Sequence, residues 1–157
     1  SQINLTKEIA LRGIDPSRLI FGERLARPEY LARYRVADLF LDTLPYNAGT
    51  TASDALRMEL PVLTCQGSSY PSRMAASIIN AVNLPELITT TPEQYESLAI
   101  ELATDQEKYK IIKDKLVSNL STAPLYDTPM FTRNLESAYT TMYESYLKKQ
   151  KPDHIYV

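Results

Sequence analysis

The chain has 157 residues and a net charge of −2, with one histidine, one cysteine and four glycines. One cysteine excludes an internal disulfide and a cysteine-rich zinc site, and one histidine, His154, excludes a two-histidine metal site. General nucleic-acid binding is disfavoured because it is usually accompanied by a basic excess, and no apolar run reaches the roughly 20 residues of a membrane span. We therefore expect a cytoplasmic domain that binds no metal, nucleic acid or membrane.

Short apolar runs alternate with helical patterns over the first two-thirds of the chain, which is typical of βα units around a parallel sheet. The expected strands are residues 18–22, 38–42 and 61–65. The expected helices are residues 3–12, 28–37, 51–60, 71–83, 92–103, 105–120 and 131–149. This order predicts an α/β part over residues 1–90 and helices that pack on it over residues 91–157.

Three strands make a thin sheet with a bare edge. The chain also begins without methionine, and we expect it to be part of a larger protein. A partner that covers the sheet edge, such as a second copy in a homo-oligomer, is the alternative. In the last expected helix, Tyr139, Tyr143 and Tyr146 recur at helix-packing spacing and are expected to be core residues.

Residues 38–57 carry the pattern with the most chemical content. A strand is followed by a loop with Gly49 and by a helix that opens on Thr50 and Thr51. Ligands of α/β domains bind at the C-terminal edge of the sheet, where a helix N-terminus offers N–H groups and partial positive charge to a phosphate. Asp54, one turn into the helix, is placed to accept hydrogen bonds from ribose or sugar hydroxyls.

The same helix start also fits a simpler interpretation. Thr51 and Asp54 have the spacing of a capping box, which only begins a helix. A capped helix end can still receive a phosphate, so the spacing leaves both interpretations open.

Two further helix starts are expected at the same edge of the sheet. Arg27 and Arg33 flank Tyr30, and an aromatic ring near two guanidinium groups can hold a nucleoside base. A solvated helix face with one packed tyrosine is the alternative. Ser72 and Arg73 follow the third expected strand.

An ordered set of motifs runs through nearly the whole chain. The motifs are Leu41-Asp42-Thr43, Pro45-Tyr46-Asn47, Gly49-Thr50-Thr51, Ser53-Asp54, Pro61-Val62-Leu63-Thr64, Ser72-Arg73, Glu86-Leu87-Ile88, Tyr95-Glu96, Leu102-Ala103-Thr104-Asp105 and Lys151-Pro152-Asp153-His154. Together they resemble the C-terminal lobe of the O-GlcNAc transferase and Spindly-like glycosyltransferases. The resemblance implies a partial, Rossmann-like C-terminal lobe of a GT-B glycosyltransferase, with a helical C-terminal tail.

The resemblance also implies roles for single residues. Thr50 and Thr51 match threonines that contact the donor diphosphate, and Asp54 matches an acid that holds the ribose. Arg33 matches an arginine near the uracil, and Leu25 matches a residue whose backbone faces the base.

Three positions depart from the animal members. Arg27 and Tyr30 stand where those enzymes carry lysine and histidine, so a cation and an aromatic ring are kept. Gly49 replaces a histidine, which leaves the donor sugar open. No catalytic residue is expected in the chain, because the family's catalytic histidine belongs to the other lobe and its phosphate-contacting lysine lies upstream.

The implied function is transfer of GlcNAc from UDP-GlcNAc to serine or threonine of a protein, with this chain as the nucleotide-sugar-binding part. A nucleotide sugar and a protein acceptor are the expected partners, no metal cofactor is expected, and the isolated chain is expected to be inactive. Alternatives are a related transferase that uses UDP-glucose on asparagine or GDP-fucose, and a non-catalytic interaction module of the same fold.

Overall fold

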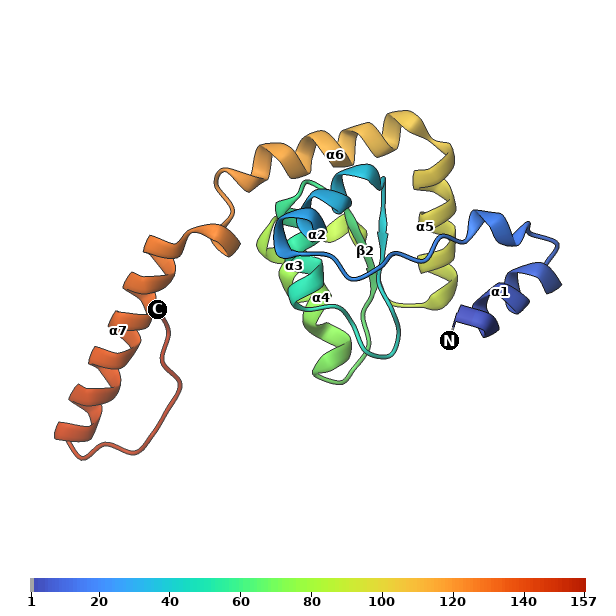
Figure 1. Ribbon diagram of the computed structural model, residues 1–157. Coiled ribbons are helices and arrows are strands. Elements are labelled where there is room, and N and C mark those ends of the chain that lie inside the picture. The colour runs from blue at the N-terminus through green and yellow to red at the C-terminus, as the bar shows by residue number, and fades with distance from the viewer. Residues whose placement is uncertain (1) are drawn as a thin grey trace. The chain divides into compact units, whose positions relative to one another are not determined.

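The structure, a computed structural model, describes residues 2–157 (Figure 1). The chain divides into two units, Ser1–Tyr30 and Leu31–Val157. The first unit holds α1 (Gln2–Leu11) and the 3-10 helix η1 (Pro16–Arg18). The boundary between the units falls inside α2 (Arg27–Arg33). None of the described residues before position 31 is buried.

The prediction of a strand at residues 18–22 is wrong. The segment after η1 is irregular and pairs with no other described strand, and Ile20 is 87% exposed. An apolar run becomes a strand only where a neighbouring strand takes up its backbone hydrogen bonds. The described part of the chain offers this run no such neighbour.

The second unit is built on a parallel sheet of β1 (Phe40–Leu41), β2 (Val62–Cys65) and β3 (Ile88–Thr89), in that order. In the register, Leu41 pairs with Leu63, and Cys65 pairs with Thr89. The strands expected at residues 38–42 and 61–65 are confirmed in shorter form, whereas β3 was not expected.

Helices surround β2. The helical elements of this unit are η2 (Tyr34–Val36), α3 (Thr50–Arg57), η3 (Pro71–Arg73), α4 (Met74–Ala81), η4 (Pro85–Leu87), α5 (Pro92–Thr104), α6 (Gln106–Leu120), η5 (Pro124–Tyr126) and α7 (Thr128–Leu147). Figure 1 shows α3 and α4 on one side of β2 and α5 on the other, and all three helices contact this strand.

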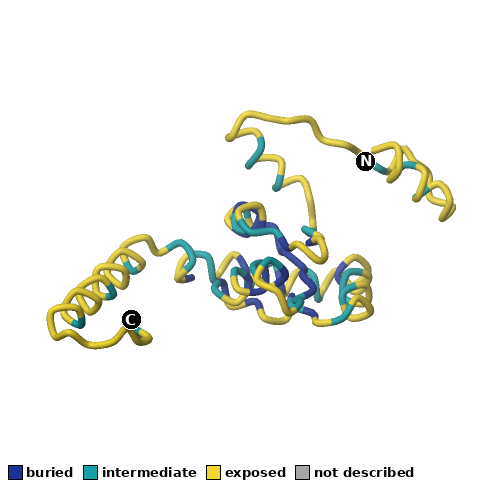
Figure 2. Tube along the Cα trace, turned by 90° about the horizontal axis from the view of Figure 1, so that it is seen from below, coloured by how far each residue is buried: buried dark blue, intermediate teal, exposed yellow. Residues whose placement is uncertain are grey.

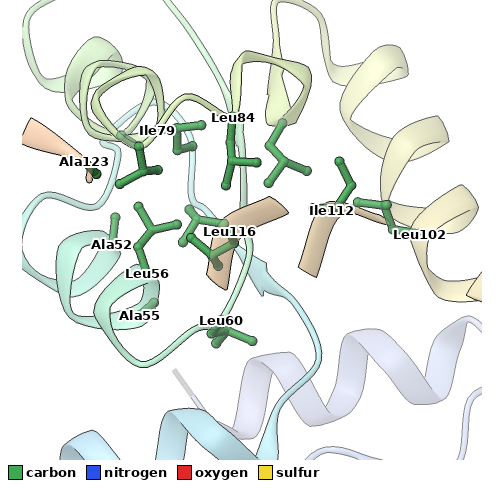
Figure 3. Close-up of a cluster of buried hydrophobic side chains, with 14 residues drawn as sticks. Ala52, Ala55, Leu56, Leu60, Ile79, Leu84, Leu102, Ile112, Leu116 and Ala123 are labelled. Carbon is green, nitrogen blue, oxygen red and sulfur yellow. The ribbon is translucent and has the colours of Figure 1, made fainter. Parts of the chain in front are cut away.

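The buried core lies around the sheet (Figure 2). Residues of α3, α4 and α6 meet in one cluster, in which Leu56, Ile79 and Leu116 are fully buried (Figure 3). β2 is buried at every position, as expected for a central strand that is covered on both faces. This cluster fixes α3, and with it the loop that precedes α3.

The helical part begins with a cap and ends with an exposed helix. Thr91 Oγ1 accepts a hydrogen bond from Gln94 N at 3.2 Å, which confirms the expected start of α5. The prediction that Tyr139, Tyr143 and Tyr146 are core residues is wrong, since they are 58%, 63% and 76% exposed. No residue of α7 is buried, and the C-terminal segment lines only a hollow with Met142 and Tyr146.

Candidate functional site

A cavity of about 290 Å³ opens where β1 ends and the following loop leads into α3. Its walls come from the end of β1, the loop and the first turn of α3: Phe40, Leu41, Asp42, Thr43, Tyr46, Asn47, Ala48, Gly49 and Thr51. This is the C-terminal edge of the sheet, where α/β folds place their ligands. The position agrees with the one expected from the sequence.

The carboxylate of Asp42 holds the two ends of this loop together. Its Oδ1 accepts hydrogen bonds from Thr43 N at 2.9 Å and from Ala48 N at 2.7 Å. Its Oδ2 accepts one from Thr64 Oγ1 at 2.6 Å, and Asp42 is only 5% exposed. A buried carboxylate with three donors is well compensated, so the loop has one strongly preferred conformation.

Asn47 closes the loop from inside. Its Nδ2 donates to Thr43 O at 2.9 Å, and its backbone N–H donates to Pro71 O at 3.1 Å. The side chain is 1% exposed, and its Oδ1 is buried and has no hydrogen-bond partner among residues 2–157. Asn47 lines the cavity, so its side chain closes the loop and its backbone N–H joins the loop to η3 directly beside the candidate site.

The N-terminus of α3 reaches the cavity without a capping side chain. Gly49 is the N-cap residue, and α3 starts at Thr50. Of the two interpretations of this helix start, the capping box of Thr51 and Asp54 is therefore wrong, since no side chain makes a cap hydrogen bond here. The first N–H groups of a helix have no partner within the helix, so this end presents donors and partial positive charge to a ligand.

Glycosyl transferase family 41 matches residues 1–135 of the chain. The chain therefore belongs to glycosyl transferase family 41. It is 32% identical over 152 residues to the UDP-N-acetylglucosamine--peptide N-acetylglucosaminyltransferase of Caenorhabditis elegans, with 97% of this chain and 13% of that protein aligned. It is 32% identical over 149 residues to the probable UDP-N-acetylglucosamine--peptide N-acetylglucosaminyltransferase SEC of Arabidopsis thaliana, with 94% of this chain and 15% of that protein aligned.

The fold agrees with this family. A mutant O-GlcNAc transferase of Thermobaculum terrenum superimposes with a TM-score of 0.82 and 32% identity, over 90% of this chain and 27% of that one. The predicted fold class, part of a Rossmann-like GT-B lobe with a helical tail, is confirmed. This chain spans only 13% to 15% of the length of the two relatives above.

The structure groups some of the predicted family 41 site residues. Gly49 and Thr51 line the cavity, and Thr50 is exposed at the first position of α3. Asp54 lies one turn further along the helix, is 8% exposed, and is outside the cavity walls. The predicted diphosphate residues are therefore together, with the predicted ribose residue behind them in the same helix.

The predicted base-binding residues lie elsewhere in the sequence and divide between the units. Leu25, Arg27 and Tyr30 belong to the first unit, and Arg33 belongs to the second. The Arg27 guanidinium lies 5.9 Å from the centroid of the Tyr30 ring, so the expected pairing of a cation with an aromatic ring is present. Arg33 is exposed on α2 and does not line the cavity.

The third expected helix start is shaped by its own hydrogen bonds. The Ser72 hydroxyl donates to Ser69 O at 2.9 Å and accepts from Ser69 N at 3.0 Å, so it closes the turn before α4. Arg73 is exposed and lines a separate hollow along α4 with Tyr70 and Met74.

Within residues 2–157, no group of three or more histidine, cysteine, aspartate or glutamate side chains could hold a metal ion. Over the same residues, no helix has the length and apolar character needed to cross a membrane.

Asp42, Asn47, Thr64 and Tyr95 shape the site but were not predicted as site residues. Tyr95, on α5, donates its hydroxyl to Asp42 O at 2.8 Å. Burial, and then the electrostatic influence of Asp42 and of Cys65, raise the pKa of Tyr95 to about 12. Asp42 follows β1 directly and Thr64 lies near the end of β2, which was a readable signal, whereas no local pattern points to Tyr95.

Proposed function

We propose that this chain is the nucleotide-sugar-binding part of a protein O-glycosyltransferase that transfers GlcNAc from UDP-GlcNAc to serine or threonine. The main support is the uncapped N-terminus of α3 at a cavity on the C-terminal edge of the sheet, in a member of family 41. The matched relatives are named as UDP-N-acetylglucosamine--peptide N-acetylglucosaminyltransferases. Since the chain spans a small part of their length, the transfer itself belongs to a larger protein.

In this proposal, α3 stabilises the diphosphate of the donor. The N–H groups of its first turn and its dipole act on the negative charge that grows as the diphosphate leaves. Thr50 and Thr51 add hydroxyl donors at the same end of the helix. These groups belong to backbone held by Asp42, so they need little rearrangement when the donor binds.

The remaining donor contacts follow the family resemblance. Asp54 holds the ribose, Arg27, Tyr30 and Arg33 surround the base, and the backbone of Leu25 faces it. No metal ion takes part in this proposal. The protein acceptor binds to parts of the enzyme outside this chain. Residues 1–90 form the partial lobe, and the helices of residues 91–157 complete it.

A cytoplasmic location is part of the same proposal. The only cysteine of the chain, Cys65, is buried and has no disulfide partner. Proteins of oxidising compartments commonly rely on disulfides, whereas cytoplasmic proteins rarely do.

Calorimetric titration of UDP into the full-length protein tests the proposal. Asp54→Ala should abolish measurable binding, whereas Asp114→Ala, at an exposed aspartate of α6, should leave the affinity unchanged. Asp54→Asn keeps the shape of the buried side chain and should also weaken binding, which separates a lost contact from a lost fold. Unchanged affinity in both Asp54 variants would contradict the site assignment.

The choice of donor sugar is tested separately, because Gly49 leaves it open. Thermal melting of the full-length protein with UDP-GlcNAc, UDP-glucose and GDP-fucose should show the largest stabilisation with UDP-GlcNAc. A larger rise in melting temperature with either of the other donors would indicate a related transferase that uses that donor. No shift with any donor would favour the non-catalytic interaction module.

A further inference from the structure

Loop 43–48 and the start of α3 are held from outside their own segment. The Asp42 carboxylate uses Oδ1 for both ends of the loop and Oδ2 for Thr64 in the neighbouring strand. The backbone carbonyl of Asp42 accepts a hydrogen bond from the Tyr95 hydroxyl at 2.8 Å. One residue at the end of β1 is thus fixed from the loop, from β2 and from α5.

Tyr95 is well suited to hold this point. It lies 53 positions from Asp42 in the sequence, so its hydrogen bond joins α5 to the end of β1. Tyr95 follows directly after the capped first turn of α5, and its backbone N–H donates to Thr91 O at 3.0 Å. Its hydroxyl is protonated at neutral pH, as tyrosine hydroxyls ordinarily are, and so can donate this hydrogen bond.

The position of Asp42 decides where the phosphate donors lie. Ala48 N is held by Asp42 Oδ1, and Gly49, the N-cap of α3, is the next residue. A shift at Asp42 is therefore passed through Ala48 to the first N–H groups of α3. Donors must lie within a few tenths of an ångström of the charge they stabilise, so small shifts of this backbone are costly.

We propose that Tyr95 is a positioning residue for diphosphate binding, acting through the backbone of Asp42 on the loop and the N-terminus of α3. The inference rests on the proposed nucleotide-binding function and extends it to a residue that lines no wall of the cavity. Tyr95 acts only on the phosphate end of the site. Loss of its hydroxyl therefore weakens the binding of ligands that carry a diphosphate. It leaves the binding of a nucleoside without phosphate unchanged.

Competition calorimetry with UDP and with uridine on full-length Tyr95→Phe tests this inference. UDP affinity should fall about fivefold, a factor typical of one lost hydrogen bond, while uridine affinity stays at the wild-type value. A general loosening of the fold would weaken both ligands equally, and that result would overturn the inference. Tyr109→Phe on α6, another half-buried tyrosine near an aspartate, is the matched control and should change neither affinity.

Asp42 provides the second variant. Asp42→Ala leaves two loop N–H groups without their acceptor and should cost more UDP affinity than Tyr95→Phe. Asp42→Asn keeps one oxygen for those N–H groups, and its amide can donate to the Thr64 hydroxyl, so most of the affinity should return. Equal losses in the alanine and asparagine variants would overturn the role of the loop hydrogen bonds.

Titration of the wild-type protein with UDP distinguishes a failure of the proposed function from a failure of the inference about Tyr95. A wild-type protein that does not bind UDP overturns the proposed function, and the inference falls with it. Wild-type binding with unchanged UDP affinity in Tyr95→Phe overturns the inference alone.

Discussion

Gly49 allows a direct test of why a glycine precedes α3. A Cβ at this position would lie 2.7 Å from Cε of Met74 and 3.8 Å from its Sδ. Carbon atoms pack best at about 3.5–4.0 Å, so Gly49→Ala forces the end of the Met74 side chain to move by about 1 Å. Because this end is flexible, the change should lower the free energy of unfolding by about 0.5–1.5 kcal/mol, the cost of a displaced rotamer.

A double-mutant cycle with Met74→Ala isolates this contact. Removing the methionine side chain makes room for the new methyl group, so Gly49→Ala should cost almost nothing in the Met74→Ala background. The coupling free energy should therefore be about 1 kcal/mol, measured by urea unfolding followed by circular dichroism. Additive losses within about 0.5 kcal/mol would refute the reasoning, since they would show that the two side chains do not meet.

The same variants separate two reasons for the glycine. A diphosphate that approaches the backbone at position 49 requires the missing Cβ even after Met74 has been removed. UDP affinity should then stay low in the double variant, although Gly49→Ala no longer lowers the free energy of unfolding in the Met74→Ala background. If the coupling free energy is observed and UDP affinity also returns in the double variant, Gly49 is needed for the packing of Met74 and not for the ligand.

Two further predictions concern stability. Leu116→Ala, in the fully buried part of the core, should lower the free energy of unfolding by about 2–5 kcal/mol, whereas Val117→Ala, at a position 43% exposed on the same helix, should cost far less. Equal losses in urea unfolding would contradict the assigned core. Between pH 10 and about 12 the folded chain keeps the Tyr95 proton that the unfolded chain loses, so stability should fall as the pH rises through this window. Tyr95→Phe should reduce that fall in melting experiments at pH 9 and 11, and an identical fall would contradict the shifted pKa.

The sequence predicted the sheet where strands lie between helices, and it failed where a strand needed a partner. β1 and β2 are short apolar runs followed by helices, and the described structure keeps both. The run at residues 18–22 also has an apolar centre but no neighbouring strand in the described part of the chain. β3 has only two residues and follows η4 directly, so its pairing with β2 left no pattern in the sequence. Strand formation depends on distant pairing as well as on local propensity.

At the site, the sequence was informative where the residues are contiguous. Gly49, Thr50 and Thr51 come to the cavity together because they share one turn of chain. The capping-box interpretation, with Thr51 as N-cap, failed by two residues, since the helix begins at Thr50 and takes Gly49 as its N-cap. The pairing of Asp42 with Thr64 was within reach, because the parallel register places the ends of adjacent strands side by side.

The contribution of Tyr95 could not be read from local patterns, because it arises from tertiary packing. The sequence pattern predicts a boundary between the α/β part and the helices at residue 90, yet several hydrogen bonds join residues on its two sides, and two of them reach residues 42–53. Tyr95 donates to Asp42 O at 2.8 Å, and Tyr126 donates to Ser53 O at 2.7 Å. These bonds hold the two ends of the segment that carries the loop and the first turn of α3. Through these hydrogen bonds the C-terminal helices help to set the geometry of the candidate phosphate site, although none of their residues lines its cavity.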